Sequence, residues 1–457
     1  MRRVGMIFLL LVSLIFGLCG CGSSVQKKGD TDNTREIRYH DDGRIILTYS
    51  VYSVSSEITK AVNEFNKVNQ DYYVEIQNFG EGKNNDISAA ILDFDLALVN
   101  SQAGDILQVD ESSYEKYARM GVFEDLYPYM EADDEFDISK YWENVIAACE
   151  IDDKLFYMPA NFNVNVMFGK ASVWEGKNTL TVDETIELLE GLQEGEELVY
   201  HMTRKDFLSD MMNNASNHFV NWTTGECNFQ SEQFMNVLKV AKFIPAEFVY
   251  NENEEHYVSK LRNNKILLYE KSGWDYRDIQ YIKAYMGEDI VAVNYPGATS
   301  EGNTISLFSQ HTYAMNSDSI VKEGVWEFIK FVLSEDYQKK KKEGIWGVPM
   351  NKAAFEKQMQ EWKTPAYELD ENGKKVERPI LLFISEDIQF EIYHATDEDV
   401  ALWRQSIENV TSVKTNNYVL TNIILEEAEP YFDGEKTVEE VTGIIQNRVN
   451  IYVNENK

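Results

Sequence analysis

The strongest constraint on the fold of this chain is an alternation of short β-favouring runs with helical patterns, which begins at Ile45. The β-favouring runs cover 45–49, 72–76 and 105–109. Between them, apolar residues recur at helical spacing over 58–68 and 87–99. Strands that alternate with helices predict an α/β fold with a parallel sheet that is covered on both faces.

Helical patterns dominate the later part of the chain. Capping boxes open at Thr181 and Thr437, and Ser231 precedes a third set of apolar residues at helical spacing. Further strands are expected at 155–158, 164–168, 266–269 and 290–293. The pair Asn372-Gly373 predicts an exposed hairpin turn. We therefore expect strands mixed with helices, and a helical C-terminal part.

The first residues have the pattern of an export signal. Arg2 and Arg3 precede a largely apolar run over 6–18, and small residues and cysteine follow. We expect residues 1–20 to be removed as a signal peptide. The apolar run is shorter than the about 20 residues that span a bilayer. The alternative is an N-terminal anchor helix that the mature protein keeps.

The tetrapeptide Leu18-Cys19-Gly20-Cys21 resembles the bacterial lipobox, in which the last cysteine is lipidated. On that resemblance the lipid acceptor is Cys21, and residues 1–20 are a lipoprotein signal peptide. Several acyl chains hold a protein stably at a bilayer. We therefore expect a lipid-anchored protein at the cell membrane that faces outward. The polar segment 21–44 is expected to be a flexible tether.

The charge of the chain excludes two classes of partner. Its 457 residues include 77 acidic residues and 43 Lys or Arg, and the formal net charge is −34. Such a field repels nucleic acid and anionic membrane surfaces, so neither is expected as a partner. A neutral solute is indifferent to the field, and an acidic one is disfavoured. Cys149 and Cys227 are too few for a disulfide framework, and whether they pair stays open.

Several segments match a known family in their order along the chain. They are Gly104–Leu107, Met120–Leu126, Asp152–Pro159, Val325–Phe331, Gly347–Asn351 and Glu427–Val453. Together they resemble the family 1 extracellular solute-binding proteins of bacterial ABC importers. Asp153 stands where this family usually has glycine. The resemblance extends over nearly the whole chain behind the lipobox.

The resemblance implies a periplasmic-binding-protein-like fold of two α/β lobes, each discontinuous in sequence, with the ligand between them. The expected boundaries are 45–158 with 303–355 for lobe I, and 159–302 with 356–457 for lobe II. The chain is expected to cross between the lobes near 157–161, near 295–303 and after Asn351. The implied function is to capture a small solute, a mono- or oligosaccharide, for an ABC permease. We expect a monomer.

A sugar site needs aromatic side chains for the ring faces and polar groups for the hydroxyl edges. In open α/β sheets such ligands bind beyond strand ends. In the family that the chain resembles, residues after the crossing strand also line the cleft. Strand ends and this resemblance together predict eight substrate-binding residues: Tyr52, Ser53, Asp110, Asn161, Asn163, Trp274, Tyr276 and Trp346. The alternative for each aromatic is ordinary packing, which we expect for Trp326 and Trp403.

The motifs of common catalytic sites are missing from the sequence. It contains no G-x-S-x-G, no H-E-x-x-H and no P-loop, and its six histidines show no ligand spacing. We therefore expect no catalytic residues, no metal and no other cofactor. With 77 acidic residues, a glycosidase pair of carboxylates stays open. The alternatives are a surface-anchored glycoside hydrolase and a carbohydrate receptor that serves no transporter.

Overall fold

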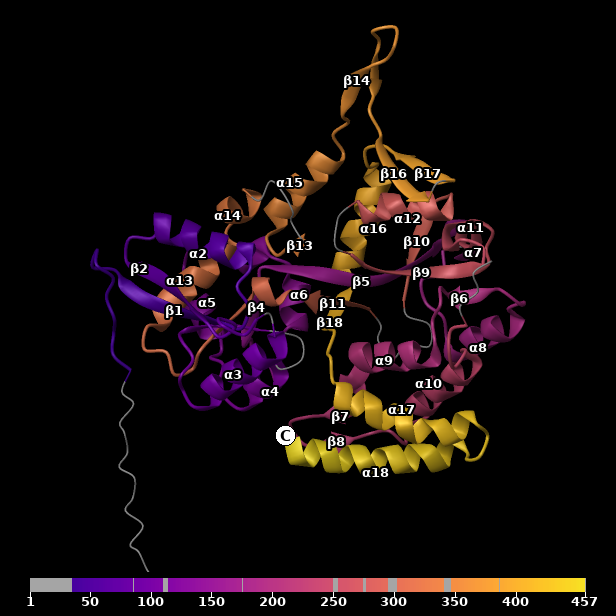
Figure 1. Cartoon of the computed structure of the whole chain (residues 1–457), viewed down its shortest axis with the longest axis horizontal. Helices are drawn as coiled ribbons and strands as arrows, with labels where there is room; N and C mark the ends of the chain where they lie inside the picture. Colours follow the sequence, from indigo (N-terminus) through magenta and orange to yellow (C-terminus); the bar gives the residue numbers. More distant parts are fainter. Residues whose placement is uncertain are drawn as a thin grey trace, which may run out of the picture. The chain divides into compact units, whose positions relative to one another are not determined.

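The computed structural model describes residues 35–84, 86–109, 114–174, 176–249, 254–273, 277–294, 302–340, 347–385 and 387–456. The chain divides into two units, Met1–Glu36 and Ile37–Lys457, and all the described helices and strands belong to the second. They form two mixed sheets with flanking helices, which confirms the predicted α/β class (Figure 1).

Five strands form the first sheet, in the order β2-β1-β3-β12-β4. They are β1 (Ile45–Val51), β2 (Tyr72–Asn78), β3 (Ile106–Gln108), β4 (Tyr157–Pro159) and β12 (Thr312–Met315). β1 is parallel to β2 and β3, whereas β12 is antiparallel to β3 and β4. The last three residues of β1 and all of β3 and β12 are buried, as in a sheet covered on both faces.

We call this sheet and the helices around it the first lobe (Figure 1). Its helices are α2 (Ser56–Val68), α3 (Ile87–Val99), α4 (Tyr114–Arg119), α5 (Tyr127–Ala132), α6 (Glu143–Ala148), α13 (Lys322–Leu333), α14 (Glu335–Lys339) and α15 (Lys352–Trp362). The Ser55 side chain caps α2 by accepting from the N–H of Ile58, and Asp86 caps α3 in the same way. The predicted helices at 58–68 and 87–99 are therefore confirmed.

The second sheet is built around the long strand β5 (Asn161–Lys170). Its other strands are β6 (Glu197–Val199), β9 (Ile266–Gly273), β10 (Ile290–Val293), β11 (Asn303–Leu307), β13 (Val348–Pro349) and β18 (Val410–Val413). β9, β10, β11 and β13 all pair with β5 in antiparallel fashion. β18 is parallel to β11, and β6 is parallel to β9.

This sheet and the following elements form the second lobe. Its helices are α7 (Ala171–Trp174), α8 (Val182–Gly191), α9 (Arg204–Ala215), α10 (Glu232–Phe243), α11 (Tyr257–Arg262), α12 (Asp278–Met286), α16 (Asp397–Glu408), α17 (Tyr418–Phe432) and α18 (Val438–Asn456). Three hairpins join β7 (Val220–Asn221) to β8 (Glu226–Cys227), β14 (Tyr367–Leu369) to β15 (Lys375–Glu377), and β16 (Ile380–Ser385) to β17 (Ile388–Ile392). The capping boxes at Thr181 and Thr437 and the turn at Gly373 are present as predicted.

The chain crosses between the sheets within the first of the three expected ranges, and the second crossing lies elsewhere. It passes from β4 in the first sheet to β5 in the second through Ala160, which confirms the first crossing. The second crossing, expected near 295–303, is wrong in position. Because β11 (303–307) still pairs with β5, the chain returns to the first sheet only over 308–311, before β12. β13 pairs with β5, and Asn351 then bridges to Tyr141 of the first lobe.

The expected lobe boundaries differ from this arrangement in three places. β11 and β13 were assigned to lobe I but pair with β5, and α15 continues past the expected boundary at 355. The predicted signal peptide 1–20, most of the tether 21–44 and the proposed lipid acceptor Cys21 lie outside the described residues. Among the helices that the structure describes, none combines the length and the apolar character that crossing a membrane requires.

Candidate functional site

The carboxyl ends of strands from both sheets meet where the chain crosses between them. β4 ends at Pro159 and β5 begins at Asn161, so the carboxyl edge of the first sheet adjoins the start of β5. β9 and β11 are antiparallel to β5, and their carboxyl ends therefore lie at the same edge. In open α/β sheets this edge is the usual place for a ligand.

One face of β5 carries a row of asparagines at this edge. Successive side chains alternate between the faces of a strand, so Asn161, Asn163 and Asn165 share one face. Asn165 Nδ2 donates to Thr304 Oγ1 at 3.1 Å and to Ser306 Oγ at 3.0 Å. Within the described part of the chain, Asn163 Oδ1 is buried and accepts no hydrogen bond. An unpaired buried acceptor is costly and requires an explanation.

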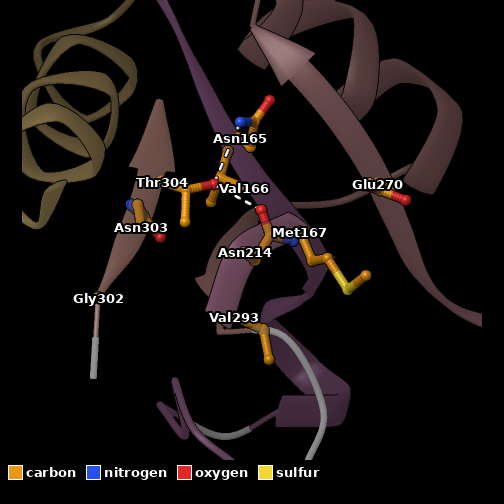
Figure 2. Close-up of a pocket in the computed structure, with 9 residues that line it drawn as sticks. All are labelled: Asn165, Val166, Met167, Asn214, Glu270, Val293, Gly302, Asn303 and Thr304. Atoms are coloured by element: carbon orange, nitrogen blue, oxygen red, sulfur yellow. Dashed lines mark hydrogen bonds between the residues drawn. The ribbon is translucent and has the colours of Figure 1, made fainter. Parts of the chain in front are cut away.

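Figure 2 shows a small pocket that is lined by residues of the second sheet and by Asn214 of α9. The Thr304 hydroxyl donates to Asn214 Oδ1 of α9 at 2.9 Å and closes one side of it. Its free volume of about 30 Å³ accommodates one or two water molecules but no sugar. Glu270 of β9 forms another side. Burial, together with the nearby charge of Asp210, raises the pKa of the Glu270 carboxyl to about 7.

A larger cavity, which we call the crevice, has a volume of about 640 Å³ and lies between the lobes. α4 contributes Tyr114 and Arg119 to its lining, and the second lobe contributes Trp222 and Tyr452. The crevice is also lined by the polar residues Glu115, Lys116, Ser216, Thr415, Asn416 and Asn417. Its size and its mixture of aromatic and polar side chains suit a small organic ligand.

The C-terminal end of α9 links the crevice to the row on β5. Asn214 bonds Thr304 on the sheet, and Ser216, two residues further along, lines the crevice. Ser216 Oγ lies 3.0 Å from Thr415 Oγ1, and Thr415 also donates its N–H to Asn213 O. Polar groups therefore continue from the strand ends to the crevice wall.

Residues 60–368 match the sequence model of one family, the bacterial extracellular solute-binding proteins. The match runs from α2 to β14 and covers more than half of the chain. The chain belongs to this family. No curated protein matches it in sequence.

Solved structures of solute-binding proteins share the fold at low sequence identity. The sugar-binding protein MalE from Xanthomonas citri is 13% identical, with a TM-score of 0.60 over 90% of this chain and 98% of its own. A periplasmic oligogalacturonide-binding protein from Yersinia enterocolitica is 14% identical, with a TM-score of 0.60 over 90% of this chain and 99% of its own. An ABC substrate-binding protein from Listeria monocytogenes, in complex with cycloalternan, is 15% identical, with a TM-score of 0.52 over 90% and 99%. The two-lobe fold expected from the family resemblance is confirmed.

Four of the eight predicted ligand contacts of this solute-binding protein lie in the described chain. Asn161 and Asn163 lie in the row on β5, and both are buried. Tyr52 is also buried, and its ring packs edge-to-face on Phe94 at 5.8 Å. Ser53 is half-buried beside it. The other four, Asp110, Trp274, Tyr276 and Trp346, lie outside the described residues.

Gln108 explains why Tyr52 and Ser53 are held at the end of β1. Its buried Oε1 accepts the backbone N–H of Tyr52 at 3.0 Å and approaches that of Ser53 at 3.4 Å. A polar side chain at the end of β3 thus fixes the turn that follows β1. The sequence analysis did not single out Gln108, since glutamine in a buried strand has no distinctive spacing.

The sequence analysis also missed the crevice residues Trp222, Asn417 and Tyr452. Asn417 caps α17, and the Tyr452 hydroxyl donates to its Oδ1 at 3.3 Å. The Trp222 ring stands edge-on to Tyr452 at 5.9 Å. An asparagine before an apolar helical pattern is a capping signal, so Asn417 could have been found. Trp222 and Tyr452 are far apart in the sequence and gave no such signal.

One group of potential metal ligands occurs in the described chain, formed by Glu197, His201 and Glu254. The ammonium group of Lys260 already pairs with both carboxylates, and its side chain is buried. These ion pairs neutralise the group, and we assign no metal to it. Cys149 and Cys227 are both free thiols. Burial raises the pKa of Cys149 to about 12, so its thiol stays protonated.

Proposed function

We propose that this protein captures a neutral mono- or oligosaccharide at the strand-end edge and in the crevice, and passes it unaltered to an ABC permease. The observation that carries this proposal is the buried Oδ1 of Asn163, which accepts no hydrogen bond from the described residues. A ligand hydroxyl group would satisfy this oxygen. Hydroxyl groups on ring edges are what distinguishes a sugar from an apolar solute.

The lining of the crevice supports a carbohydrate. The rings of Trp222 and Tyr452 offer apolar surfaces to sugar faces, and Asn416 and Asn417 offer amide groups to hydroxyls. Trp274, Tyr276 and Trp346 remain proposed contacts, as do Tyr52, Ser53, Asp110 and Asn161. The relatives described above include proteins named for sugars and oligosaccharides.

The net charge of −34 favours a neutral ligand over an acidic one. We propose that the chain acts as a monomer on the outer face of the cell membrane, held by lipid on Cys21 after removal of residues 1–20. Replacing Cys21 with serine should release the protein from the membrane fraction and abolish its labelling by a fatty acid. Labelling that persists in the Cys21→Ser variant would contradict this anchor.

Isothermal titration against a panel of neutral saccharides, beside galacturonides, tests the binding function. We expect saturable binding of a neutral saccharide, and recovery of that saccharide unchanged after prolonged incubation. A ligand that binds only the folded state also raises the melting temperature, so a thermal-shift screen can select the saccharides first. Newly formed reducing ends would instead support a glycoside hydrolase and would refute the proposal.

Single substitutions locate the site. Asn163→Leu, which removes the acceptor at similar volume, should weaken binding about tenfold, the effect of one lost hydrogen bond. Trp274→Ala and Trp346→Ala should each weaken it at least as much. The matched control is Asn236→Leu in α10, outside the crevice lining, which should leave affinity unchanged. Equal effects of Asn163→Leu and Asn236→Leu would remove the main support for this site.

A further inference from the structure

Three side chains join the two lobes away from the crossing strands. Arg119 ends α4 of the first lobe, Asp152 lies in a turn shortly after α6, and Thr223 lies between β7 and β8 of the second lobe. The Thr223 hydroxyl lies 2.8 Å from Asp152 Oδ2, and Thr223 Oγ1 accepts from Arg119 Nη1 at 2.5 Å. Arg119 Nη1 lies 3.4 Å from Asp152 Oδ2. A charge pair of the first lobe thus binds a hydroxyl group of the second.

The turn of the first lobe is built to present Asp152. Asp152 and Asp153 have positive φ angles of 52° and 59°. The backbone groups of Ile151 and Lys154 bond each other across them, at 2.9 and 3.2 Å. Two consecutive left-handed residues define a type I′ turn, which Asn, Asp and Gly adopt most readily. This tight turn fixes the backbone of Asp152, from which its carboxylate reaches Thr223.

The hairpin that carries Thr223 is equally well fixed. Asn221 Oδ1 accepts the backbone N–H groups of Thr223 and Thr224, at 3.0 and 2.9 Å. Gln446 of α18 anchors the end of the hairpin, because its side chain donates to Cys227 O at 2.7 Å and accepts from Phe229 N. Both partners of the contact are therefore held in place by their own lobes, and the contact costs little further ordering.

The contact borders the crevice. Arg119 lines it from the first lobe, and Trp222, the residue before Thr223, lines it from the second. The strands β4, β5 and β11, beside which the chain crosses between the lobes, lie away from α4 and β7 (Figure 1). A hinge motion at the crossing segments separates most widely the groups that are farthest from the hinge. The three side chains would therefore part when the lobes open.

We propose that Arg119, Asp152 and Thr223 form a latch that holds the lobes together across the crevice, and that its opening is a step in ligand release. The second part of this proposal rests on the function proposed above. The latch contributes free energy only to the closed arrangement, so its loss shifts the equilibrium between closed and open lobes toward open. It does so whether or not a ligand is bound.

Small-angle X-ray scattering of the ligand-free protein tests the latch alone. Thr223→Val removes the hydroxyl at constant shape, and Asp152→Asn removes the charge while keeping a residue that tolerates positive φ. Both variants should increase the radius of gyration. The matched controls are Thr223→Ser, which keeps the hydroxyl, and Asp153→Asn, which removes the same charge one residue away. Both controls should scatter like the wild type. Thr223→Val scattering that matches the wild type would overturn the latch.

Stopped-flow kinetics with a saccharide found by titration tests the second part. Thr223→Val and Asp152→Asn should each raise the ligand dissociation rate about two- to fivefold, because the Asp152 side chain is partly exposed and such contacts are weakened by solvent. The double variant should dissociate no faster than either single variant, because both break one unit. Wild-type dissociation rates in Thr223→Val would refute the role in release. If no saccharide binds at all, the proposed function fails, while the scattering result still decides the latch.

Discussion

The two sheets of this protein bury different kinds of side chain. In the first sheet the strands face packed aromatic rings, and the Phe328 ring of α13 lies 5.2 to 6.0 Å from those of Tyr49, Phe65 and Tyr313. The second sheet is equally apolar on one face of β5, where Phe162 is fully buried. Its opposite face instead carries the asparagine row, Thr304, Ser306 and Glu270.

This difference indicates a division of roles. Apolar burial stabilises the fold in proportion to the area removed from water, whereas buried polar groups stabilise little unless they are fully paired. The first sheet therefore contributes strongly to the free energy of unfolding. The polar face of the second sheet weakens the fold at some positions and provides hydrogen-bonding groups at the edge where a ligand would bind. Substitutions in the two regions should accordingly affect stability by very different amounts.

The largest effect is expected in the first lobe. Phe328→Ala leaves a cavity among three aromatic rings and should lower the free energy of unfolding by about 3–5 kcal/mol. Phe328→Leu keeps most of the side-chain volume and should lower the free energy of unfolding by less. This variant can be measured even if Phe328→Ala does not fold. Urea unfolding measures both. Phe383→Ala on β16 is the control, because this ring is 66% exposed and should change stability little. A cost below about 1 kcal/mol for Phe328→Ala would contradict the role of the first sheet.

The second effect is confined to the polar face and depends on pH. Burial raises the pKa of Glu270 from 4.5 in the unfolded chain to about 7 in the folded protein. The folded state therefore holds a proton between these values that the unfolded state has lost, and stability falls as pH rises from about 4.5 to 7. Glutamine cannot ionise, so Glu270→Gln removes this pH-dependent fall in stability. It should stabilise the protein at pH 8 by on the order of 3 kcal/mol and have little effect near pH 4.5.

Urea unfolding at both pH values, with Glu368→Gln as the control, checks this dependence. Glu368 lies on the exposed strand β14, so its substitution should change stability equally little at both pH values. If Glu270→Gln stabilised the protein equally at both pH values, a change in packing rather than the removed charge would be the cause.

Local sequence patterns predicted many of the individual helices and strands, but they predicted the pairing of distant strands less well. The first strand begins at Ile45 as predicted, and the predicted helix 87–99 has these bounds in the structure. These elements depend on apolar spacing and on capping residues within a few positions. The pairing of β11 with β5 joins Thr304 to Asn165 across 139 residues, and no local pattern specifies such a partner. For this reason the second crossing was misplaced.

The candidate site was predictable only in part, for the same reason. Asn161 and Asn163 follow a strand and a proline at which the chain changes sheets, so their place could be inferred from chain order. Tyr52 also follows a strand, yet its ring packs on Phe94, because sequence position does not determine the direction of a ring. Arg119, Asp152 and Thr223 come together only in three dimensions.

A smaller effect on stability is expected at Asn165, where the polar face of β5 is hydrogen-bonded. Asn165→Ala removes the donor that Thr304 Oγ1 and Ser306 Oγ share and should cost about 1–2 kcal/mol of unfolding free energy. Thr304 keeps its bond to Asn214, which limits the loss. Thermal and urea unfolding both report it. A cost comparable to that of Phe328→Ala would mean that the paired groups of the second sheet stabilise the fold as strongly as the first core.

The smallest effect on stability is expected at Asn163, two residues away on the same face. Its buried Oδ1 has no hydrogen bond from the described residues to lose, so Asn163→Leu should change the free energy of unfolding by less than about 0.5 kcal/mol, or raise it. The same substitution should weaken saccharide binding. A residue whose removal leaves stability intact but reduces affinity is retained for the ligand rather than for the fold. If Asn163→Leu were as destabilising as Asn165→Ala, Asn163 would be a structural member of the row, and the division between the two sheets would not extend to the binding edge.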